Sequence, residues 1–112
     1  MKEKSPLIKI ITTTSTREEA QRIGDILVKE GLAACCQVSG PILSVYPWKG
    51  NIERDEEWVL TVKTTKDMYD ACERRIQEVH SYECPQIMAF RAEAVYGPYE
   101  EWLRGWLEER RS

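Results

Sequence analysis

The spacing of hydrophobic residues predicts that the chain begins with a strand that leads into a helix. Leu7–Thr14 is rich in β-branched residues, which favours a β-strand. In the next segment Ala20, Ile23 and Leu27 fall on one face of a helix, which predicts an amphipathic helix over residues 17–30. The helix would bury this face against the strand.

The middle of the chain predicts a long antiparallel hairpin. Residues 32–48 are rich in strand-forming types but contain Gly40 and Pro41, so we expect a long strand with a bulge or bend there. Residues 49–51 supply a turn, and residues 58–64 then alternate between the two faces of a second long strand.

Capping residues and helical periodicity predict the remaining elements. Thr16, with Glu19 three positions later, forms a capping box that opens the first helix. A second helix is expected over residues 66–80, followed by a strand over residues 86–94. A C-terminal amphipathic helix begins near Pro98, and its apolar residues are spaced three and four positions apart: Tyr99, Trp102, Leu103, Trp106 and Leu107.

This order of elements, βαββαβ with a terminal helix, predicts an α+β fold. It fits the split βαβ plan, in which two helices cover one face of a single antiparallel sheet. The opposite face is left over, and the two middle strands are apolar on both sides, so we expect other copies of the chain to bury it. The pattern therefore predicts a homo-oligomer.

Length and charge narrow the class of protein. A chain of 112 residues suits one compact domain, so we expect residues 1–112 to form a single domain. The net charge of -3 is not typical of a nucleic-acid partner. The apolar run at residues 7–11 is too short for a signal peptide or a membrane span. We therefore expect a cytoplasmic protein that has no membrane partner.

The cysteines are more typical of core residues than of a disulfide framework. Cys35, Cys36, Cys72 and Cys84 match neither a CxxC pair nor a zinc-finger spacing. Free cysteine is often buried as a small apolar side chain, which is the interpretation we prefer.

Several segments together resemble the CutA family of divalent-cation tolerance proteins. These segments are GLAACCQ at residues 31–37, SVYPWKGNIERDEEW at residues 44–58, VKTT at residues 62–65, HSYECPQI at residues 80–87, and the spacing of Tyr99 and Trp102. The resemblance covers nearly the whole chain. It implies a ferredoxin-like βαββαβ sandwich with a long central hairpin and an extra C-terminal helix. It also implies a tight trimer, with hairpins edge to edge between subunits, similar in architecture to the PII signalling proteins.

The chain departs from the family pattern at positions that bear on metal binding. Ser81 stands where the family often has proline, Gln86 where it often has glutamate, and Gln37 where asparagine is common. Some members carry a cysteine, proposed as a copper ligand, at the position that matches Thr14. These differences concern the metal chemistry more than the fold.

The segment after the second helix contains the candidate metal ligands His80, Glu83 and Cys84. They offer one imidazole, one carboxylate and one thiolate, a set of ligand types that suits Cu(II) or Zn(II). His80 is the only histidine, so a single chain cannot form a site with three histidines. In the alternative interpretation, His80 ends the helix as an imidazolium favoured by the helix dipole, and Glu83 pairs locally.

The acidic residues of the hairpin are the second candidate group. Asp55, Glu56 and Glu57, together with Glu53, could bind a hard cation or act as acid and base if their oxygens converged. Neighbouring residues on a strand point to opposite faces, so convergence is disfavoured. We interpret these acids as solvated strand residues.

Aromatic residues suggest a cleft between subunits of the trimer. Tyr46 and Trp48 share a strand face, and Trp58 approaches them from the opposite strand, which favours cross-strand aromatic packing. The resemblance adds the possibility of a ligand cleft lined by Tyr46, Trp48 and Tyr82 beside His80. No nucleophile elbow, P-loop or dinucleotide fingerprint is present, so we expect no catalytic residues and no enzyme.

Three functional hypotheses remain open at this stage. The first is a homotrimeric protein of divalent-cation tolerance that binds copper weakly and has no organic cofactor. The second is a PII-like sensor or scaffold that binds a small ligand at the subunit clefts. The third is an enzyme of unknown reaction, which we rank last because fold alone does not establish chemistry.

Overall fold

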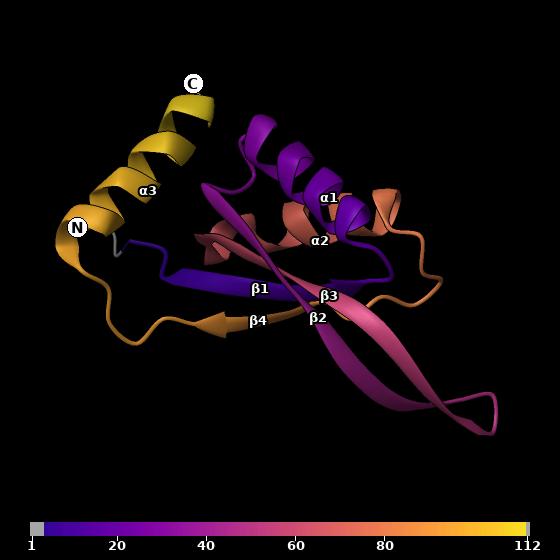
Figure 1. Cartoon of the computed structure of the whole chain (residues 1–112). Coiled ribbons are helices and arrows are strands. Elements are labelled where there is room, and N and C mark those ends of the chain that lie inside the picture. Colours follow the sequence, from indigo (N-terminus) through magenta and orange to yellow (C-terminus); the bar gives the residue numbers. More distant parts are fainter. Residues whose placement is uncertain (1–3, 112) are drawn as a thin grey trace.

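A four-stranded antiparallel sheet forms the centre of the structure, a computed structural model that describes residues 4–111 (Figure 1). The strands lie in the order β2-β3-β1-β4, with β2 and β4 at the two edges. Their bounds are Leu7–Thr14 for β1, Cys35–Trp48 for β2, Asn51–Thr65 for β3 and Met88–Arg91 for β4. The helices are α1 at Arg17–Lys29, α2 at Tyr69–Val79 after a 3-10 turn at Lys66–Met68, and α3 at Gly97–Arg111. None of the helices within the described range is long and apolar enough to cross a membrane.

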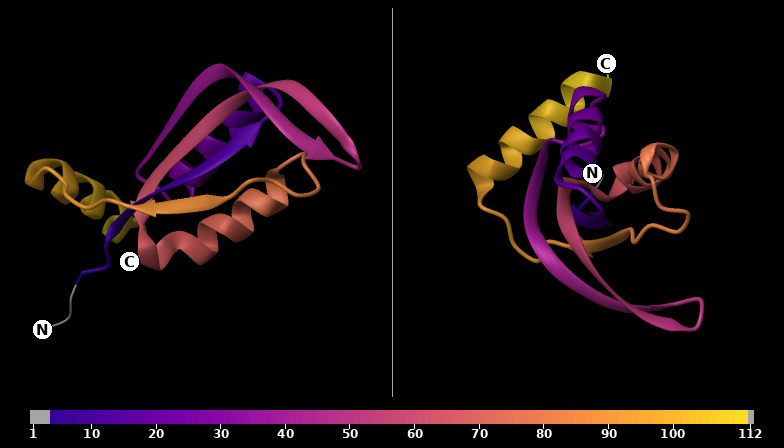
Figure 2. Two further views of the ribbon diagram at one scale, coloured as in Figure 1. Left: turned by 90° about the horizontal axis from the view of Figure 1, so that it is seen from below. Right: turned by 45° about the vertical axis from the view of Figure 1, so that its right-hand side comes forward.

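Helices α1 and α2 pack on one face of the sheet (Figures 1 and 2). Alternate residues of the two central strands point toward the helices, because side chains on a strand alternate between faces. They form one buried core with the helices, and its fully buried members include Ile10, Leu60 and Val62 of the sheet, Ile23 and Leu27 of α1, and Cys72 and Ile76 of α2. The predicted βαββαβ order with a terminal helix is therefore confirmed.

Helix α3 forms a second, smaller core at the end of the sheet. Leu103 and Leu107 pack there against Leu7 and Ala34. The guanidinium group of Arg104 donates a hydrogen bond to the carbonyl of Ser5 at 2.8 Å. This helix thus holds the start of β1 but leaves most of the sheet face opposite α1 and α2 uncovered.

The β2–β3 hairpin projects well beyond the helices (Figure 1). Its two-residue turn consists of Lys49 and Gly50, which both have positive φ, 50° and 86°. Positive φ at both central residues is typical of the type I′ turn that matches the twist of a two-residue hairpin. Trp48 and Asn51 face each other beside the turn, so strand pairing extends to the tip. The molecule consequently has a longest dimension of 52 Å against 26 and 21 Å.

The predicted interruption of the first hairpin strand is confirmed as a β-bulge between Ser39 and Ile42. Gly40 has a φ of 142°, and a Cβ atom at that position would lie 2.9 Å from Cδ1 of Trp58. Trp58 therefore packs against the bulge and the main core. The expected packing of Trp58 with the aromatic residues near the hairpin tip is wrong, because residues 51–57 of β3 separate Trp58 from the turn at Lys49 and Gly50.

Two predicted elements are shorter in the structure than expected. The helix expected over residues 66–80 begins with a 3-10 turn, and its last helical residue is Val79. The strand expected over residues 86–94 is reduced to Met88–Arg91, which pairs with residues 8–11 of β1. Its length is limited because Pro85 cannot donate a ladder hydrogen bond and because β1 itself begins at Leu7.

Candidate functional site

The segment after α2 is held in place by the buried imidazole of His80. Its Nε2 atom lies 2.8 Å from the carbonyl oxygen of Thr13, and its Nδ1 atom lies 3.0 Å from the backbone N–H of Tyr82. A carbonyl can only accept and a backbone N–H can only donate, so the proton resides on Nε2 and the ring is neutral. The side chain is fully buried. The interpretation of His80 as an imidazolium at the helix end is therefore wrong.

Glu19 also holds this segment in place, although the sequence pattern predicts only a helix-capping role for it. The backbone N–H of Glu19 donates to the hydroxyl of Thr16 at 3.1 Å, as the capping box predicts. Its carboxylate, however, accepts hydrogen bonds from the backbone N–H and the hydroxyl of Ser81 at 2.8 and 2.9 Å. An oxygen of Glu19 also lies 3.6 Å from Nδ1 of His80. Because Nδ1 carries no proton, that approach is not an ion pair.

One tyrosine–carboxylate pair connects the same segment to the hairpin, and a second pair joins the two strands of the hairpin. The hydroxyl of Tyr82 donates to Glu57 at 2.6 Å, and the hydroxyl of Tyr46 donates to Asp55. Burial, followed by the hydrogen bond to Glu57, raises the pKa of Tyr82 above its ordinary value. The hydrogen bond to Asp55 is the main cause that raises the pKa of Tyr46 to about 12. Both phenols therefore stay protonated and act as donors at neutral pH.

These contacts revise the interpretation of the acidic residues and of the aromatic cleft. Glu57 is buried, with 8% of its surface exposed, so it is not a solvated strand residue. Asp55 and Glu57 lie two positions apart on β3, so Tyr46 of β2 and Tyr82, which follows α2, contact the same part of that strand. Trp48 lies further out, beside the turn, where Lys49 sits 5.7 Å from its ring centroid. The structure thus brings two of the three predicted cleft residues into one region.

The predicted metal ligands do not form a metal-binding group in the described residues. Both ring nitrogens of His80 are already engaged in backbone hydrogen bonds. Glu83 and Cys84 are exposed to solvent on the chain that follows. A tight copper site needs three or four converging donors. The set His80, Glu83 and Cys84 in this arrangement does not fit one.

The cysteines lie in three different environments. Cys72 is fully buried, and its thiol donates a weak hydrogen bond to the carbonyl of Leu32. Burial raises the pKa of the Cys36 and Cys72 thiols to about 12, so neither is a thiolate near neutral pH. Cys84 is exposed. All four cysteines are free thiols, and Cys72 behaves as the predicted apolar core residue.

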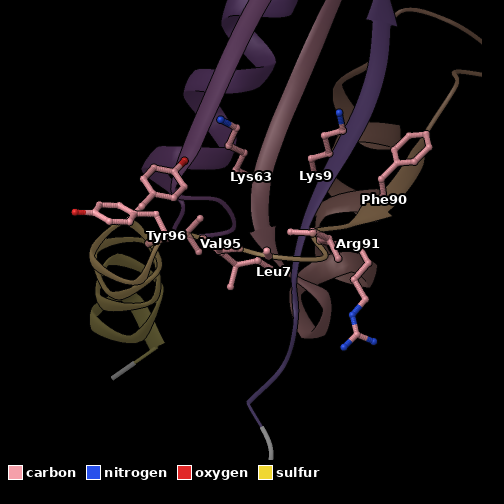
Figure 3. Close-up of a pocket in the computed structure, with 12 residues that line it drawn as sticks. Leu7, Lys9, Lys63, Phe90, Arg91, Val95 and Tyr96 are labelled. Carbon is pink, nitrogen blue, oxygen red and sulfur yellow. The ribbon is translucent and has the colours of Figure 1, made fainter.

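A cavity of about 350 Å³ lies on the sheet face that α1 and α2 leave uncovered (Figure 3). Its walls come from β1, β3, β4 and the start of α3. Apolar side chains, including Leu7, Val95 and Leu103, form most of it. Lys9 and Lys63 line it from neighbouring strands. This cavity did not emerge from the sequence pattern, because it depends on the position of α3 relative to the sheet.

The large exposed hydrophobic residues of the described chain are confined to two separate surfaces. The hairpin patch consists of Ile42, Leu43, Val45, Trp48 and Ile52, and the β4–α3 patch consists of Met88, Phe90, Tyr96 and Trp102. Leu43 is 70% exposed and Tyr96 is 76% exposed. Several large apolar side chains exposed in the same region are typical of an interaction site.

Comparison with known sequences gives a consistent result along nearly the whole chain. A family model described as CutA1 divalent ion tolerance protein matches residues 8–105. The divalent-cation tolerance protein CutA of Thermus thermophilus is 34% identical over 95 residues, covering 85% of this chain and 92% of that protein. The chloroplastic protein CutA 1 of Oryza sativa is 31% identical over 88% of this chain, which spans only 56% of that longer relative.

Solved structures share the fold described above. CutA from Synechococcus elongatus has a TM-score of 0.88 and 37% identity, covering 95% of this chain and 94% of its own. A protein from Archaeoglobus fulgidus described as the periplasmic divalent cation tolerance protein CutA has a TM-score of 0.87 and 31% identity, covering 90% of this chain and 98% of its own.

Proposed function

The chain belongs to the CutA1 divalent-ion tolerance family, and from this premise we propose that it is a homotrimer that acts in the response to divalent metal ions and binds Cu(II) weakly. It needs no organic cofactor, catalyses no reaction, binds neither nucleic acid nor membrane, and works in the cytoplasm. The observation that carries the proposed assembly is the division of the exposed hydrophobic residues into the hairpin patch and the β4–α3 patch.

Two different patches on one chain favour a head-to-tail contact between copies. If the hairpin patch of one copy covers the β4–α3 patch of the next, the contact is heterologous, and heterologous contacts form a ring when the rotation closes. A ring of three is the assembly that the resemblance to the family implies. It would also cover the unpaired edges of β2 and β4, which otherwise remain templates for aggregation.

The electrostatic character of the two patches supports the same pairing. The hairpin carries Glu53, Asp55 and Glu56, whereas Lys9, Lys63 and Arg91 line the cavity beside the β4–α3 patch. Opposite charges would steer the two surfaces toward each other and disfavour contact between two identical patches. Charge complementarity therefore favours the heterologous arrangement.

The assembly is tested by native mass spectrometry and light scattering at micromolar protomer concentration. Leu43→Glu in the hairpin patch and Phe90→Glu in the β4–α3 patch should each reduce the trimer to monomer. Gln77→Glu, an exposed position on α2, is the matched control and should remain trimeric.

Mixing the two variants separates a heterologous from an isologous interface. A Leu43→Glu chain retains an intact β4–α3 patch, and a Phe90→Glu chain retains an intact hairpin patch. Their equimolar mixture should therefore form a one-to-one dimer through a single intact contact. A monomeric wild type, or a mixture that stays monomeric, would contradict the proposed assembly.

Weak copper binding follows from the donors that remain accessible after α2. Glu83 and Cys84 are exposed and adjacent, which offers one carboxylate and one thiol per chain. Two donors hold a transition metal less tightly than a full tetrahedral or square-planar set. This proposal therefore assigns the weak binding to Glu83 and Cys84 and leaves His80 in its structural role.

Copper titration with detection by native mass spectrometry tests this assignment. The double variant Glu83→Gln/Cys84→Ser should lose bound copper, while His80→Ala should keep the wild-type stoichiometry. Loss of copper in His80→Ala with retention in the double variant would reverse the assignment. If the wild type binds no copper, the copper proposal is wrong, and the proposed trimer is unaffected.

A second candidate function is the PII-like sensor, and the cavity of about 350 Å³ favours it. This volume falls within the range of small-molecule sites, which is roughly 300–1,000 Å³. In the proposed trimer the cavity would border the surface that a neighbouring hairpin covers. A ligand bound there could influence how subunits meet, as a sensor requires.

A further inference from the structure

Lys9 and Lys63 are placed directly opposite each other on the uncovered sheet face. They are register partners on the antiparallel strands β1 and β3. Like charges at directly opposed positions destabilise a sheet. Among the described residues, neither ammonium group has a carboxylate partner, and each instead lies 5.7 Å from an aromatic ring centroid, Phe90 for Lys9 and Tyr99 for Lys63. The repulsion between the two ammonium groups is therefore not offset by a carboxylate of the described residues.

Among the described residues, those that line the cavity with these lysines carry positive charge and no negative charge. Three of its lining residues are cationic, Lys9, Lys63 and Arg91, and none is an aspartate or glutamate. Figure 3 shows Lys9 and Lys63 extending from neighbouring strands, whereas Arg91 points away from both of them. The pair on the central strands is thus the cationic part of the cavity.

Besides the two lysines, a buried hydroxyl group also favours a ligand in this cavity. The hydroxyl of Tyr99, which also lines the cavity, is buried and has no hydrogen-bond partner within the described chain. A buried polar group without a partner costs free energy, and such groups are rare in native proteins. A ligand oxygen near Lys63 could accept from this hydroxyl. The first turn of α3, whose dipole favours negative charge, borders the same space.

We propose that this cavity binds a small carboxylate with an apolar aromatic or branched aliphatic body. The carboxylate lies between Lys9 and Lys63, and the apolar body packs against Leu7, Val95 and Leu103. The cavity of about 350 Å³ is large enough for such a molecule. An anion between the two ammonium groups would offset the repulsion between them. This inference names a ligand class for the sensor function and rests on that second candidate alone.

The test compares two probes that share one apolar body and differ in the head group, the anion 3-phenylpropionate and its neutral amide, 3-phenylpropanamide. Each is titrated into the assembled wild-type protein and followed by amide NMR. The carboxylate should bind about tenfold or more tightly than the amide, because charge-assisted hydrogen bonds are roughly twice as strong as neutral ones. The largest shifts should fall in residues 90–99 and around Lys63.

Variants identify the groups that cause the preference. In Lys9→Gln/Lys63→Gln the two probes should bind with nearly equal affinity, while the matched control Arg74→Gln, at an exposed position on α2, should keep the wild-type ratio. Equal affinity in the wild type, an undiminished preference in the double variant, or shifts confined to other surfaces would each overturn the inference.

One further outcome would assign the lysine pair to another carboxylate. If the wild type shows no preference for the acid and the double variant changes the oligomer mass, the lysines pair with the acidic hairpin of a neighbouring copy. That result would overturn the ligand site and leave the assembly intact. The masses of both variants, measured by native mass spectrometry, keep the two failures distinguishable.

Discussion

Replacing His80 by alanine should destabilise the fold strongly, because the buried imidazole connects two backbone groups that are far apart in sequence. Its ring joins the carbonyl of Thr13 to the N–H of Tyr82 from a fully buried position. The substitution removes both hydrogen bonds and leaves a space where the ring was. The end of β1 and the segment after α2 would lose their direct connection.

The expected loss follows from the groups left behind. A buried donor or acceptor without a partner costs about 1–3 kcal/mol, and His80→Ala leaves one of each. With the lost packing of the ring, we expect the free energy of unfolding to fall by about 3–5 kcal/mol. Typical domains are stable by only about 5–15 kcal/mol, so this is a large fraction of the total.

Urea unfolding at a fixed protomer concentration measures the effect, since oligomer stability depends on concentration. With a slope of about 1–3 kcal/mol per molar urea, a loss of about 3–5 kcal/mol should lower the midpoint by about 1–5 M. His80→Gln, whose amide carries a donor and an acceptor, should lose less. Glu83→Gln is the exposed control and should change stability by less than about 0.5 kcal/mol. A loss below about 1 kcal/mol in His80→Ala would refute the structural role of the ring.

Two further predictions concern the bulge and the phenols. Gly40→Ala should lower the free energy of unfolding by about 1–3 kcal/mol, because the new Cβ meets Trp58 at a residue with positive φ. Gly105→Ala, where nothing lies within 4 Å of the new Cβ, should instead stabilise α3 by about 0.5–1 kcal/mol. Equal effects of the two substitutions in urea unfolding would contradict this reasoning. Burial and then the bond to Glu73 raise the pKa of Tyr69 from 10 to about 12 in the folded protein. The protonated phenol therefore adds stability that is complete below pH 10 and is lost as the pH rises through 12. Tyr69→Phe should flatten this alkaline decline in the urea midpoint, and an unchanged decline would count against the assignment.

Hydrophobic periodicity was sufficient for the fold because most of the sheet and helix residues obey it locally. Ile23 and Leu27 of α1, and Leu60 and Val62 of β3, are buried where their spacing predicts. The bulge could also be predicted, since the Gly40 and Pro41 pair cannot continue a regular ladder.

The contacts of the candidate site could not be predicted, because their partners are distant in sequence. His80 and Thr13 are 67 positions apart, and Glu19 and Ser81 are 62 apart. Glu19 fits a local capping pattern, so the sequence provides no reason to expect its hydrogen bonds to Ser81. A buried carboxylate is recognisable only when the structure shows its exposure and its donors.

The positions of the two opposed lysines could be predicted only in part from the sequence. The alternation of β1 and β3 places Lys9 and Lys63 on the face away from the core, which is where a sequence pattern puts solvated residues. Only the register of the two strands makes them direct partners, and only the position of α3 encloses them in a cavity.

The separation of the two cores means that this chain need not open all at once. Leu103 and Leu107 hold α3 to a small cluster that is distinct from the core beneath α1 and α2. Regions with few buried contacts open with free energies below that of global unfolding. Amides of α3 should therefore exchange with deuterium sooner than those of β1 and β3, while the sheet stays protected. The cavity wall formed by α3 would then be a local folding unit whose docking and release occur without disturbing the rest of the molecule.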